Sequence, residues 1–275
     1  MRAFDAAAYV ADEELATLIF LSTKLGKPLL LEGPPGVGKT EVANVLARVL
    51  QTQLIRLQCY EGLDVHTAVY EWNYQKQLLT IKIQEHGSKT EAEKEQYIFG
   101  EEFLLKRPLL QAITAEQAPV LLIDEIDRAD EEFEAFLLEL LSAFQISIPE
   151  MGTIRAVHRP YVLLTSNRTR ELSDALKRRC LYHWLNFPSL EKEQQIVHKH
   201  LPHIAEQLAA RVVEVVQNIR RKKLEKRPGI AETLDWARAL LALGYEELTP
   251  AAMGRTLGCL LKSEADIQLV KKEEL

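Results

Sequence analysis

The sequence predicts an α/β fold, in which a parallel sheet is covered by helices, followed by a small all-α domain. Short apolar runs typical of strands alternate with amphipathic helical patterns as far as Phe187, and this alternation favours a parallel sheet covered on both faces. A glycine-rich loop joins the first strand directly to a helix, and only helical patterns follow from Pro188 onward. We therefore expect an α/β domain at residues 1–187 and an all-helical domain at residues 188–275.

The composition indicates a protein with a substantial core and without a basic surface. The chain has 275 residues, of which 47% are hydrophobic, and 34 Lys+Arg against 40 Asp+Glu give a formal net charge of -6. An acidic balance disfavours attraction to nucleic acid or anionic lipid. The three cysteines lie far apart without a CxxC pair, and charged residues interrupt the N-terminal stretch. We expect reduced thiols, no transmembrane segment, no nucleic-acid partner and a cytoplasmic protein.

The elements of the sheet domain follow from local patterns. A helix capped near Asp12 ends before Lys27-Pro28, and the apolar run 29–31 then forms a short buried strand. The next helix places valines and leucines between 42 and 50 on one face, at the spacing of a helix that packs on a sheet. Further strands are expected at 54–59, 120–124, 161–166 and 182–187.

The sequence predicts two insertions in the sheet domain and a set of helices after this domain. Residues 60–108 are long for a connection, so we expect an insertion with its own helix or hairpin. It contains the charged run 89–96 and three alternating aromatic residues at 70, 72 and 74, a spacing that favours packing on one face of a strand. Residues 145–156 alternate around the turn PEMG, which predicts a β-hairpin. Helices are expected at 189–200, 203–223, 230–243 and 249–262, with the basic run 220–227 as a solvated helix end or an intersubunit surface.

GPPGVGKT, residues 33–40, is the strongest motif. It matches GxxxxGK[ST] between a predicted strand and a predicted helix, the context that a phosphate-binding loop requires. Glycines let backbone N–H groups wrap phosphate oxygens, and the helix N-terminus adds partial positive charge. We expect Lys39 to reach the β- and γ-phosphates of ATP and the Thr40 hydroxyl to bind Mg²⁺. The candidate nucleotide-binding residues are Gly33, Pro34, Pro35, Gly36, Val37, Gly38, Lys39 and Thr40.

LLIDEIDRAD, residues 121–130, places acids at the end of an apolar strand. Hydrolysis of ATP needs carboxylates for Mg²⁺ and for the attacking water at the carboxyl end of a strand beside the phosphate loop. Asp124 is the candidate Mg²⁺ partner, acting through water, and Glu125 is the candidate general base. Asp127 or Asp130 can instead cap the next helix, and Asp130 has the better position because two further acids follow it.

Polar and basic residues downstream extend this pattern. The strand YVLLTSN ends in Asn167, whose amide could orient the attacking water, although an Asn after a strand is otherwise a turn residue. In ALKRRC, Lys177, Arg178 and Arg179 lie near the end of a predicted helix, where the helix dipole favours cations. Either Arg178 or Arg179 could instead complete the nucleotide site of a neighbouring subunit.

The combination of these motifs resembles the AAA+ ATPases, which usually form hexameric rings with ATP between subunits. The hairpin and the long insertion look like the helicase-loader-like clade that contains the MoxR family. Longer segments are similar to the CoxD-like branch of MoxR proteins, which is linked to maturation of molybdenum-containing carbon monoxide dehydrogenase. These segments are LIRLQCYEGLDVHTAVYEWNY, PVLLIDEIDRADEEFEAFLLELLSAFQISIPEMGTIRA and LTSNRTRELSDALKRRCLYHW, and the similarity covers about residues 10–245.

The resemblance implies a role for each candidate residue and shows one departure. It assigns Walker A to residues 33–40, Walker B to Asp124 and Glu125, sensor 1 to Asn167, and the arginine finger to Arg178 or Arg179. MoxR relatives commonly carry a sensor-2 arginine early in the third lid helix, where PGIAETLDW has Ala231 and Glu232. Either Arg227 or Arg238 substitutes for it, or the lid senses nucleotide weakly.

Motifs and resemblance together predict an Mg²⁺-dependent AAA+ ATPase that assembles as a ring, expected to be a hexamer, and remodels a client protein. The resemblance implies a molybdenum hydroxylase such as carbon monoxide dehydrogenase as the client, and a von Willebrand factor A domain protein as a companion. Two alternatives share the ATP motifs: a nucleic-acid motor or loader, and a nucleotide-gated assembly switch with little turnover. Glu125 disfavours the switch, because such a switch has little need of a general base.

Overall fold

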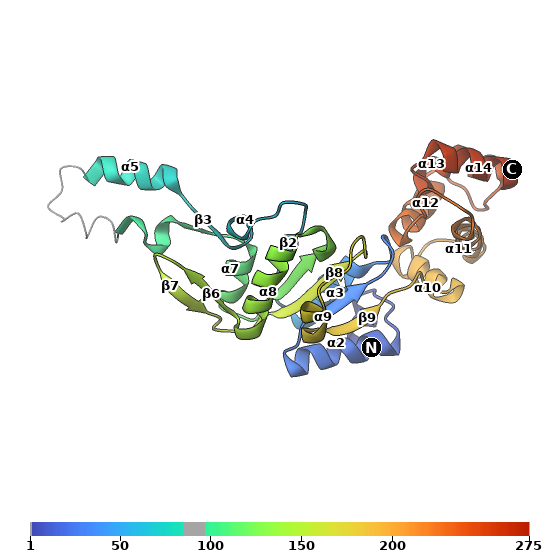
Figure 1. Cartoon of the computed structure of the whole chain (residues 1–275). Coiled ribbons are helices and arrows are strands. Elements are labelled where there is room, and N and C mark those ends of the chain that lie inside the picture. Colours follow the sequence, from blue (N-terminus) through green and yellow to red (C-terminus); the bar gives the residue numbers. More distant parts are fainter. Residues whose placement is uncertain (1, 85–96, 275) are drawn as a thin grey trace. The chain divides into compact units, whose positions relative to one another are not determined.

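The computed structural model describes residues 2–84 and 97–274 of the chain (Figure 1). Contacts divide the chain into two compact units, each with its own buried hydrophobic cluster. The sheet unit comprises Thr17–Glu32 and Leu46–His183, and the helical unit comprises Met1–Ala16, Gly33–Val45 and Trp184–Leu275. The domain boundary expected at 187–188 stays a prediction. Within the described ranges, no helix combines the length and the apolar character that a membrane span requires.

The central sheet confirms the predicted α/β fold. Its five strands run in the order β2-β5-β8-β1-β9. β1 pairs with β8, β8 with β5 and β5 with β2, and all three pairings are parallel. β1 and β5 are buried along their whole length, as expected of strands covered on both faces. The strand bounds are β1 Leu29–Glu32, β2 Leu54–Gln58, β5 Val120–Asp124, β8 Tyr161–Ser166 and β9 Leu181–Trp184.

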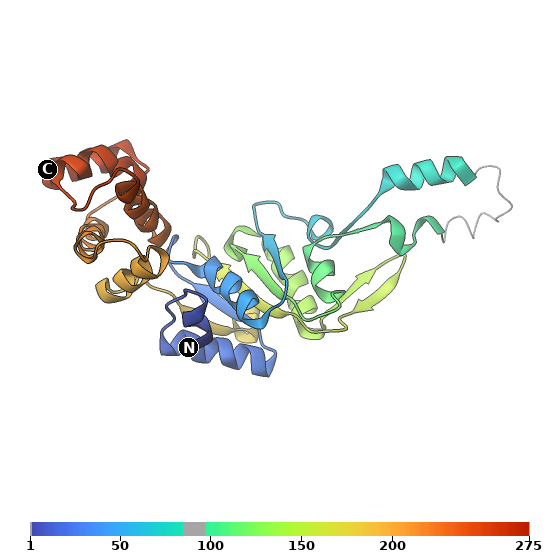
Figure 2. The same ribbon diagram turned by 180° about the vertical axis from the view of Figure 1, so that it is seen from behind.

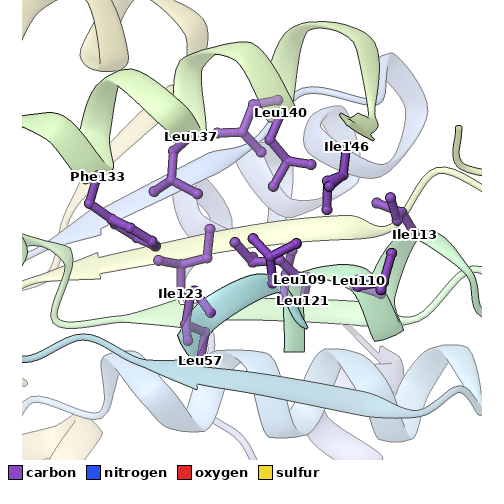
Figure 3. Packing of buried hydrophobic residues seen from close by; sticks show 14 of the residues in the cluster. Leu57, Leu109, Leu110, Ile113, Leu121, Ile123, Phe133, Leu137, Leu140 and Ile146 are labelled. Carbon is purple, nitrogen blue, oxygen red and sulfur yellow. The ribbon is translucent and has the colours of Figure 1, made fainter. Parts of the chain in front are cut away.

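Helix α8 (Glu131–Ala143) shows how one helix and the sheet share a core. Phe133, Leu137 and Leu140 recur at i, i+4 and i+7, so they lie on one face of the helix. Figure 3 shows these side chains directed at β5, with Ile123 below them. All four side chains are almost completely buried. Apart from the helices of the long insertion, the other described helices before β9 are α1 Arg2–Ala6, α2 Glu13–Leu25, α3 Lys39–Leu50, α7 Pro108–Ile113, the 3-10 helix η2 Ile126–Arg128 and α9 Asp174–Arg179.

The caps of α2 and α8 are those that the sequence predicts. The N–H of Leu15 donates to Asp12 Oδ1 at 2.8 Å, which makes Asp12 the cap of α2. The N–H of Phe133 donates to Asp130 Oδ1 at 2.8 Å, so Asp130 caps α8 and Asp127 does not.

The long insertion has both a helix and a strand pair of its own. β3 (Tyr70–Trp72) pairs in antiparallel fashion with β4 (Leu104–Lys106), and helix α5 (Tyr74–Gln84) follows β3. The expected aromatic face is wrong at Tyr74, which is 64% exposed while Tyr70 and Trp72 are buried, because the chain changes from strand to helix at Asn73. The remaining elements of the insertion are α4 Val65–Val69 and the 3-10 helix η1 Glu101–Phe103.

A second strand pair confirms the predicted hairpin. β6 (Gln145–Ile148) and β7 (Gly152–Arg155) pair in antiparallel fashion. Figure 1 and Figure 2 show this hairpin and α5 extending from the same end of the sheet unit. The predicted charged run 89–96 lies outside the described residues.

The helical unit contains the four C-terminal helices that the sequence predicts and one more. Trp236 is completely buried at its centre, among apolar side chains of the neighbouring helices. The fifth helix, α14, was not expected, because its sequence is mostly charged and polar. The bounds are α10 Leu190–His200, α11 Glu206–Arg221, α12 Ile230–Ala242, α13 Pro250–Leu260 and α14 Glu264–Glu274.

A buried ion pair corrects the expectation for the basic run 220–227. Arg220 is 6% exposed and donates to both carboxylate oxygens of Glu193, at 2.5 and 2.7 Å. Thr233 donates to the same carboxylate at 2.8 Å, and the guanidinium of Arg220 lies 4.7 Å from the ring centre of Phe187. The first residue of the run therefore belongs to the core that joins α10, α11 and α12, while Arg221 and Arg227 are exposed.

Candidate functional site

The predicted phosphate loop is a compact turn between β1 and α3. Gly36 and Gly38 have φ angles of 82° and 91°, in the left-handed region where a side chain would be strained. Lys39 begins α3 and is 6% exposed. Its Nζ donates to the backbone oxygens of Gly33 at 2.7 Å and of Pro34 at 2.8 Å. The loop thus wraps around the lysine amine, and Thr40 follows in the first turn of the helix.

The start of α12 contacts this loop through backbone atoms. The N–H of Ile230 donates to the oxygen of Gly36 at 2.8 Å. A Cβ placed on Gly229 would lie 2.6 Å from the Cα of Gly36, so two glycines are needed for this approach. Glu232 accepts from the N–H of Gly229 at 3.0 Å and caps the helix.

The two arginines considered as substitutes for sensor 2 are exposed on the helical unit. Arg238 pairs with Asp235 of its own helix at 3.0 Å. Arg227 precedes α12. The contact that the structure gives between α12 and the loop is therefore made by the backbone of Gly229 and Ile230.

Asp124 is the buried acid at the carboxyl end of β5. It is 2% exposed, and each carboxylate oxygen has a donor. Thr165 Oγ1 donates to Oδ1 at 2.5 Å, and Arg56 Nε donates to Oδ2 at 3.0 Å. Thr165 Oγ1 also accepts from the N–H of Glu125 at 2.9 Å, so one hydroxyl fixes both acids. Sequence reasoning missed Arg56, whose pairing depends on β2 lying beside β5.

Glu125 is held at the same edge of the sheet by two hydrogen-bond donors and one ion pair. Its backbone has φ 55° and ψ 49°, a left-handed conformation that non-glycine residues rarely adopt and that is often found at functional sites. Asn167 Nδ2 lies 3.1 Å from Oε1, while Gln58 Nε2 and Arg128 Nε each lie 3.1 Å from Oε2. The structure therefore brings Asn167 and Glu125 together, as the order of strand ends predicts, and adds Gln58 from β2.

Asp127 is the acid whose partners the sequence did not reveal. Its carboxylate is 3% exposed and accepts from the N–H of Asn167 at 3.1 Å and the N–H of Thr169 at 2.8 Å. The hydroxyl of Thr169 donates to Oδ2 at 2.7 Å. Burial raises the pKa of Asp127, but the hydrogen bonds from Thr169 and Asn167 outweigh it, and the net shift is downward.

The acids give this edge of the sheet a negative potential. Burial, together with the nearby charges of Asp124, Asp127 and Glu125, raises the pKa of the Cys59 thiol to about 12. The N–H of Cys59 donates to the oxygen of Asp124 at 2.8 Å, so the thiol lies just beyond β2. A cation bound at this edge would be electrostatically favoured.

Arg178 and Arg179 lie in the last turn of α9 and are exposed. Arg179 donates to the hydroxyl of Ser142 at the end of α8. Among the described residues, Gln58 and Asn167 donate to the Glu125 carboxylate, and Arg128 forms an ion pair with it.

The available ligands fit Mg²⁺ that arrives with a nucleotide. Among the described residues, no cluster of three or more His, Cys, Asp or Glu side chains could hold a metal ion. Mg²⁺ usually keeps several waters and binds through one or two carboxylates together with substrate phosphates. Hydroxyl and carboxylate oxygens, such as those of Thr40 and Asp124, are ligands of this chemical kind.

The family to which the chain belongs follows from its sheet segment. The AAA domain family (dynein-related subfamily) matches residues 28–180, which is more than half of the chain. The chain is an AAA-domain protein. Proteins with this domain are P-loop nucleotide hydrolases, and the matched range contains the phosphate loop, both acids of the β5 end and the β8 end.

Relatives of this AAA-domain protein include two uncharacterized proteins of Staphylococcus aureus, from strains bovine RF122 / ET3-1 and USA300. Each is 32% identical over 161 residues, which cover 56% of this chain and 54% of the relative. The match thus spans about half the length of these relatives. Neither carries a MoxR or CoxD-like name, and that branch assignment stays a prediction.

Solved structures with a similar fold include Thermotoga maritima RuvB. The RuvB Holliday junction branch migration motor has a TM-score of 0.50 at 18% identity, covering 90% of this chain and 67% of RuvB. Two RuvB variants reach TM-scores of 0.54 and 0.53 at 19% identity, covering 91% and 90% of this chain and 70% and 68% of theirs. At this identity the likeness shows the AAA+ fold alone.

Proposed function

We propose that this AAA-domain protein is an Mg²⁺-dependent ATPase that assembles as a ring in the cytoplasm and remodels a client protein. The observation that carries the hydrolytic step is the Glu125 carboxylate, held by Asn167 and Gln58 at the carboxyl edge of the sheet. The phosphate loop begins where β1 ends, at the same edge of that sheet. Parallel sheets bind their ligands at this edge.

ATP binds through its phosphates to residues 33–40. Backbone N–H groups of the loop surround the phosphates, and Lys39 exchanges its bonds with the loop oxygens of Gly33 and Pro34 for bonds with phosphate oxygens. Thr40 and Asp124 would hold Mg²⁺, which would supply positive charge against the charge that develops on the transferring phosphoryl group.

Glu125 accepts the proton of the attacking water. Its carboxylate keeps its direction because Gln58 donates to one oxygen, which also forms an ion pair with Arg128, and the amide of Asn167 donates to the other oxygen. This contact supports the role proposed for Asn167, which is to orient the attacking water beside the carboxylate. A general base with fixed geometry contributes about 100- to 10,000-fold to a rate.

The ring and the client are the finer parts of the proposal. Arg178 and Arg179 are exposed at the end of α9, where either can act as an arginine finger at the site of a neighbouring subunit. The similarity to the CoxD-like branch supports a molybdenum hydroxylase as client and a von Willebrand factor A domain protein as companion. The net charge of -6 disfavours the nucleic-acid motor that shares these motifs.

The substitution Glu125→Gln tests the hydrolytic step. Glutamine keeps the size of the side chain and cannot accept the proton of water, so we expect turnover to fall about 100-fold or more while ATP still binds. Phosphate release and equilibrium binding of a fluorescent ATP analogue measure the two effects. Glu132→Gln, on the exposed first turn of α8, serves as the control and should match the wild type. Turnover that survives Glu125→Gln would show that Glu125 is not the general base, whereas a wild type that binds ATP with little turnover would favour the nucleotide-gated switch.

A further inference from the structure

The turn after β8 has an unusual backbone. Arg168 has φ 60°, a left-handed conformation for a residue with a side chain. Its N–H donates to Ser166 Oγ at 3.0 Å. The N–H groups on either side of it, those of Asn167 and Thr169, both donate to the carboxylate of Asp127, at 3.1 and 2.8 Å. Backbone N–H groups that converge in such a turn form an anion-binding concavity, and here a side chain of the protein fills it.

Asp127 reaches this turn from the segment that follows β5. Its carboxylate is buried and also accepts from the hydroxyl of Thr169 at 2.7 Å. These charge-assisted hydrogen bonds are stronger than neutral ones, and leaving their donors unpaired in a buried place is costly. The carboxylate therefore fixes the left-handed turn and, with it, the point from which the Asn167 side chain leaves the backbone.

Three further contacts attach the following residues to the same segment. Arg170 Nε donates to the oxygen of Ala129 at 3.0 Å, and Arg170 pairs with Glu134 at 2.5 Å. The N–H of Ser173 donates to the other oxygen of Glu134 at 2.9 Å. The turn cannot move far from β5 while these contacts hold, and Asp127 is the contact nearest to Asn167.

We propose that Asp127 is a positioning residue for hydrolysis. Its carboxylate holds the 166–169 turn so that the Asn167 amide reaches Glu125 at 3.1 Å. This inference rests on the proposed roles of Glu125 and Asn167, and it assigns Asp127 an action through Asn167 alone. Without it the turn relaxes from its left-handed conformation, and the amide loses its direction.

The substitution Asp127→Asn tests this role with little change in shape. An amide has one acceptor oxygen in place of two, so it cannot serve Asn167 and Thr169 together. We expect kcat to fall roughly 10- to 100-fold, as misplacement of a catalytic group does, while KM and the Kd for the ATP analogue stay within about twofold. Asp130→Asn is the matched control, because asparagine caps a helix as well as aspartate does. Equal kcat values for the two variants would overturn the inference.

A double-mutant cycle separates positioning from general structural support. Asn167→Ala removes the amide but keeps the backbone N–H that donates to Asp127. If Asp127 acts through that amide, adding Asp127→Asn to Asn167→Ala lowers kcat little further. Losses that multiply would mean that the two residues act independently, and would contradict a positioning role.

Hydrogen exchange gives a readout that needs no turnover. Asp127→Asn should speed exchange of the amides at 167 and 169 at least tenfold, while Asp130→Asn leaves them unchanged. If Asp127→Asn does not fold, Thr169→Val removes only the hydroxyl donor and should give a smaller loss of kcat and faster exchange. Unchanged exchange would overturn the inference even with an active wild type. A wild type without Glu125-dependent turnover would instead defeat the proposed function, and with it the hydrolytic part of this inference.

Discussion

Asp127 and Asp130 lie three positions apart and have different partners. Asp130 caps the helix that follows it, which the local sequence predicts because two more acids and an apolar face come next. Asp127 bonds to Asn167 and Thr169, about 40 residues further along the chain. No local pattern indicates such a partner, since it depends on which strands become neighbours. Arg56 and Gln58 were missed for the same reason.

The pKa of Asp127 predicts a dependence of stability on pH. Because hydrogen bonds hold this pKa below its usual value in the folded chain, the unfolded chain binds the proton more readily. The contribution of Asp127 is complete above the unfolded pKa of about 4 and is lost as pH falls through the folded pKa. Urea unfolding between pH 2 and 7 should therefore show a steeper loss of unfolding free energy below about pH 4 for the wild type than for Asp127→Asn. Parallel curves would show that this carboxylate is not linked to folding.

At the scale of elements, sequence patterns predicted the strands and helices well where burial repeats along the chain. β8 matches the expected range, and β5 does too, because apolar runs bounded by polar ends are local signals. Sequence patterns predicted burial wrongly at positions where contacts between distant residues determine it. Arg220 looked like part of a solvated basic run, but Glu193 on another helix buries it. Tyr74 does not share the buried face of Tyr70 and Trp72, because the strand ends before it.

The contact between α12 and the phosphate loop gives a prediction for two glycines. A Cβ on Gly229 would lie 2.6 Å from Gly36 Cα and 2.8 Å from Gly36 O, so Gly229→Ala must separate the backbones and weaken the bond from Ile230. We expect a loss of about 1–3 kcal/mol in unfolding free energy, the usual effect of overpacking.

Gly258 is the matched control for this substitution. It lies within α13, and a Cβ there would meet nothing within 4 Å. Gly258→Ala should stabilise the chain by up to about 1 kcal/mol, because alanine favours helix. Urea unfolding measures both variants. Equal effects of the two substitutions would show that the approach of α12 to the loop does not contribute to stability.

At the scale of the whole molecule, Glu125 and the arginines of α9 differ in their surroundings within one chain. Glu125 has its donors within its own chain, whereas Arg178 and Arg179 are exposed at the end of a short helix. A ring gives exposed arginines a place to act, at the site of the neighbouring subunit. If that is so, each complete site takes Glu125 from one subunit and the arginine from the neighbouring subunit.

Mixing two inactive variants tests this division. Glu125→Gln subunits keep their arginines, and Arg178→Ala subunits keep Glu125, so a mixed ring contains sites with one intact group from each. We expect ATP turnover of the mixture to exceed the sum of the separate variants several-fold, and to rise with total protein concentration as subunits assemble. Arg179→Ala, assayed in the same way, shows which arginine acts, and Lys177→Ala on the same helix turn is the control. A mixture that equals the sum at every concentration would mean that each site is complete within one chain, because no group is then supplied by a neighbour.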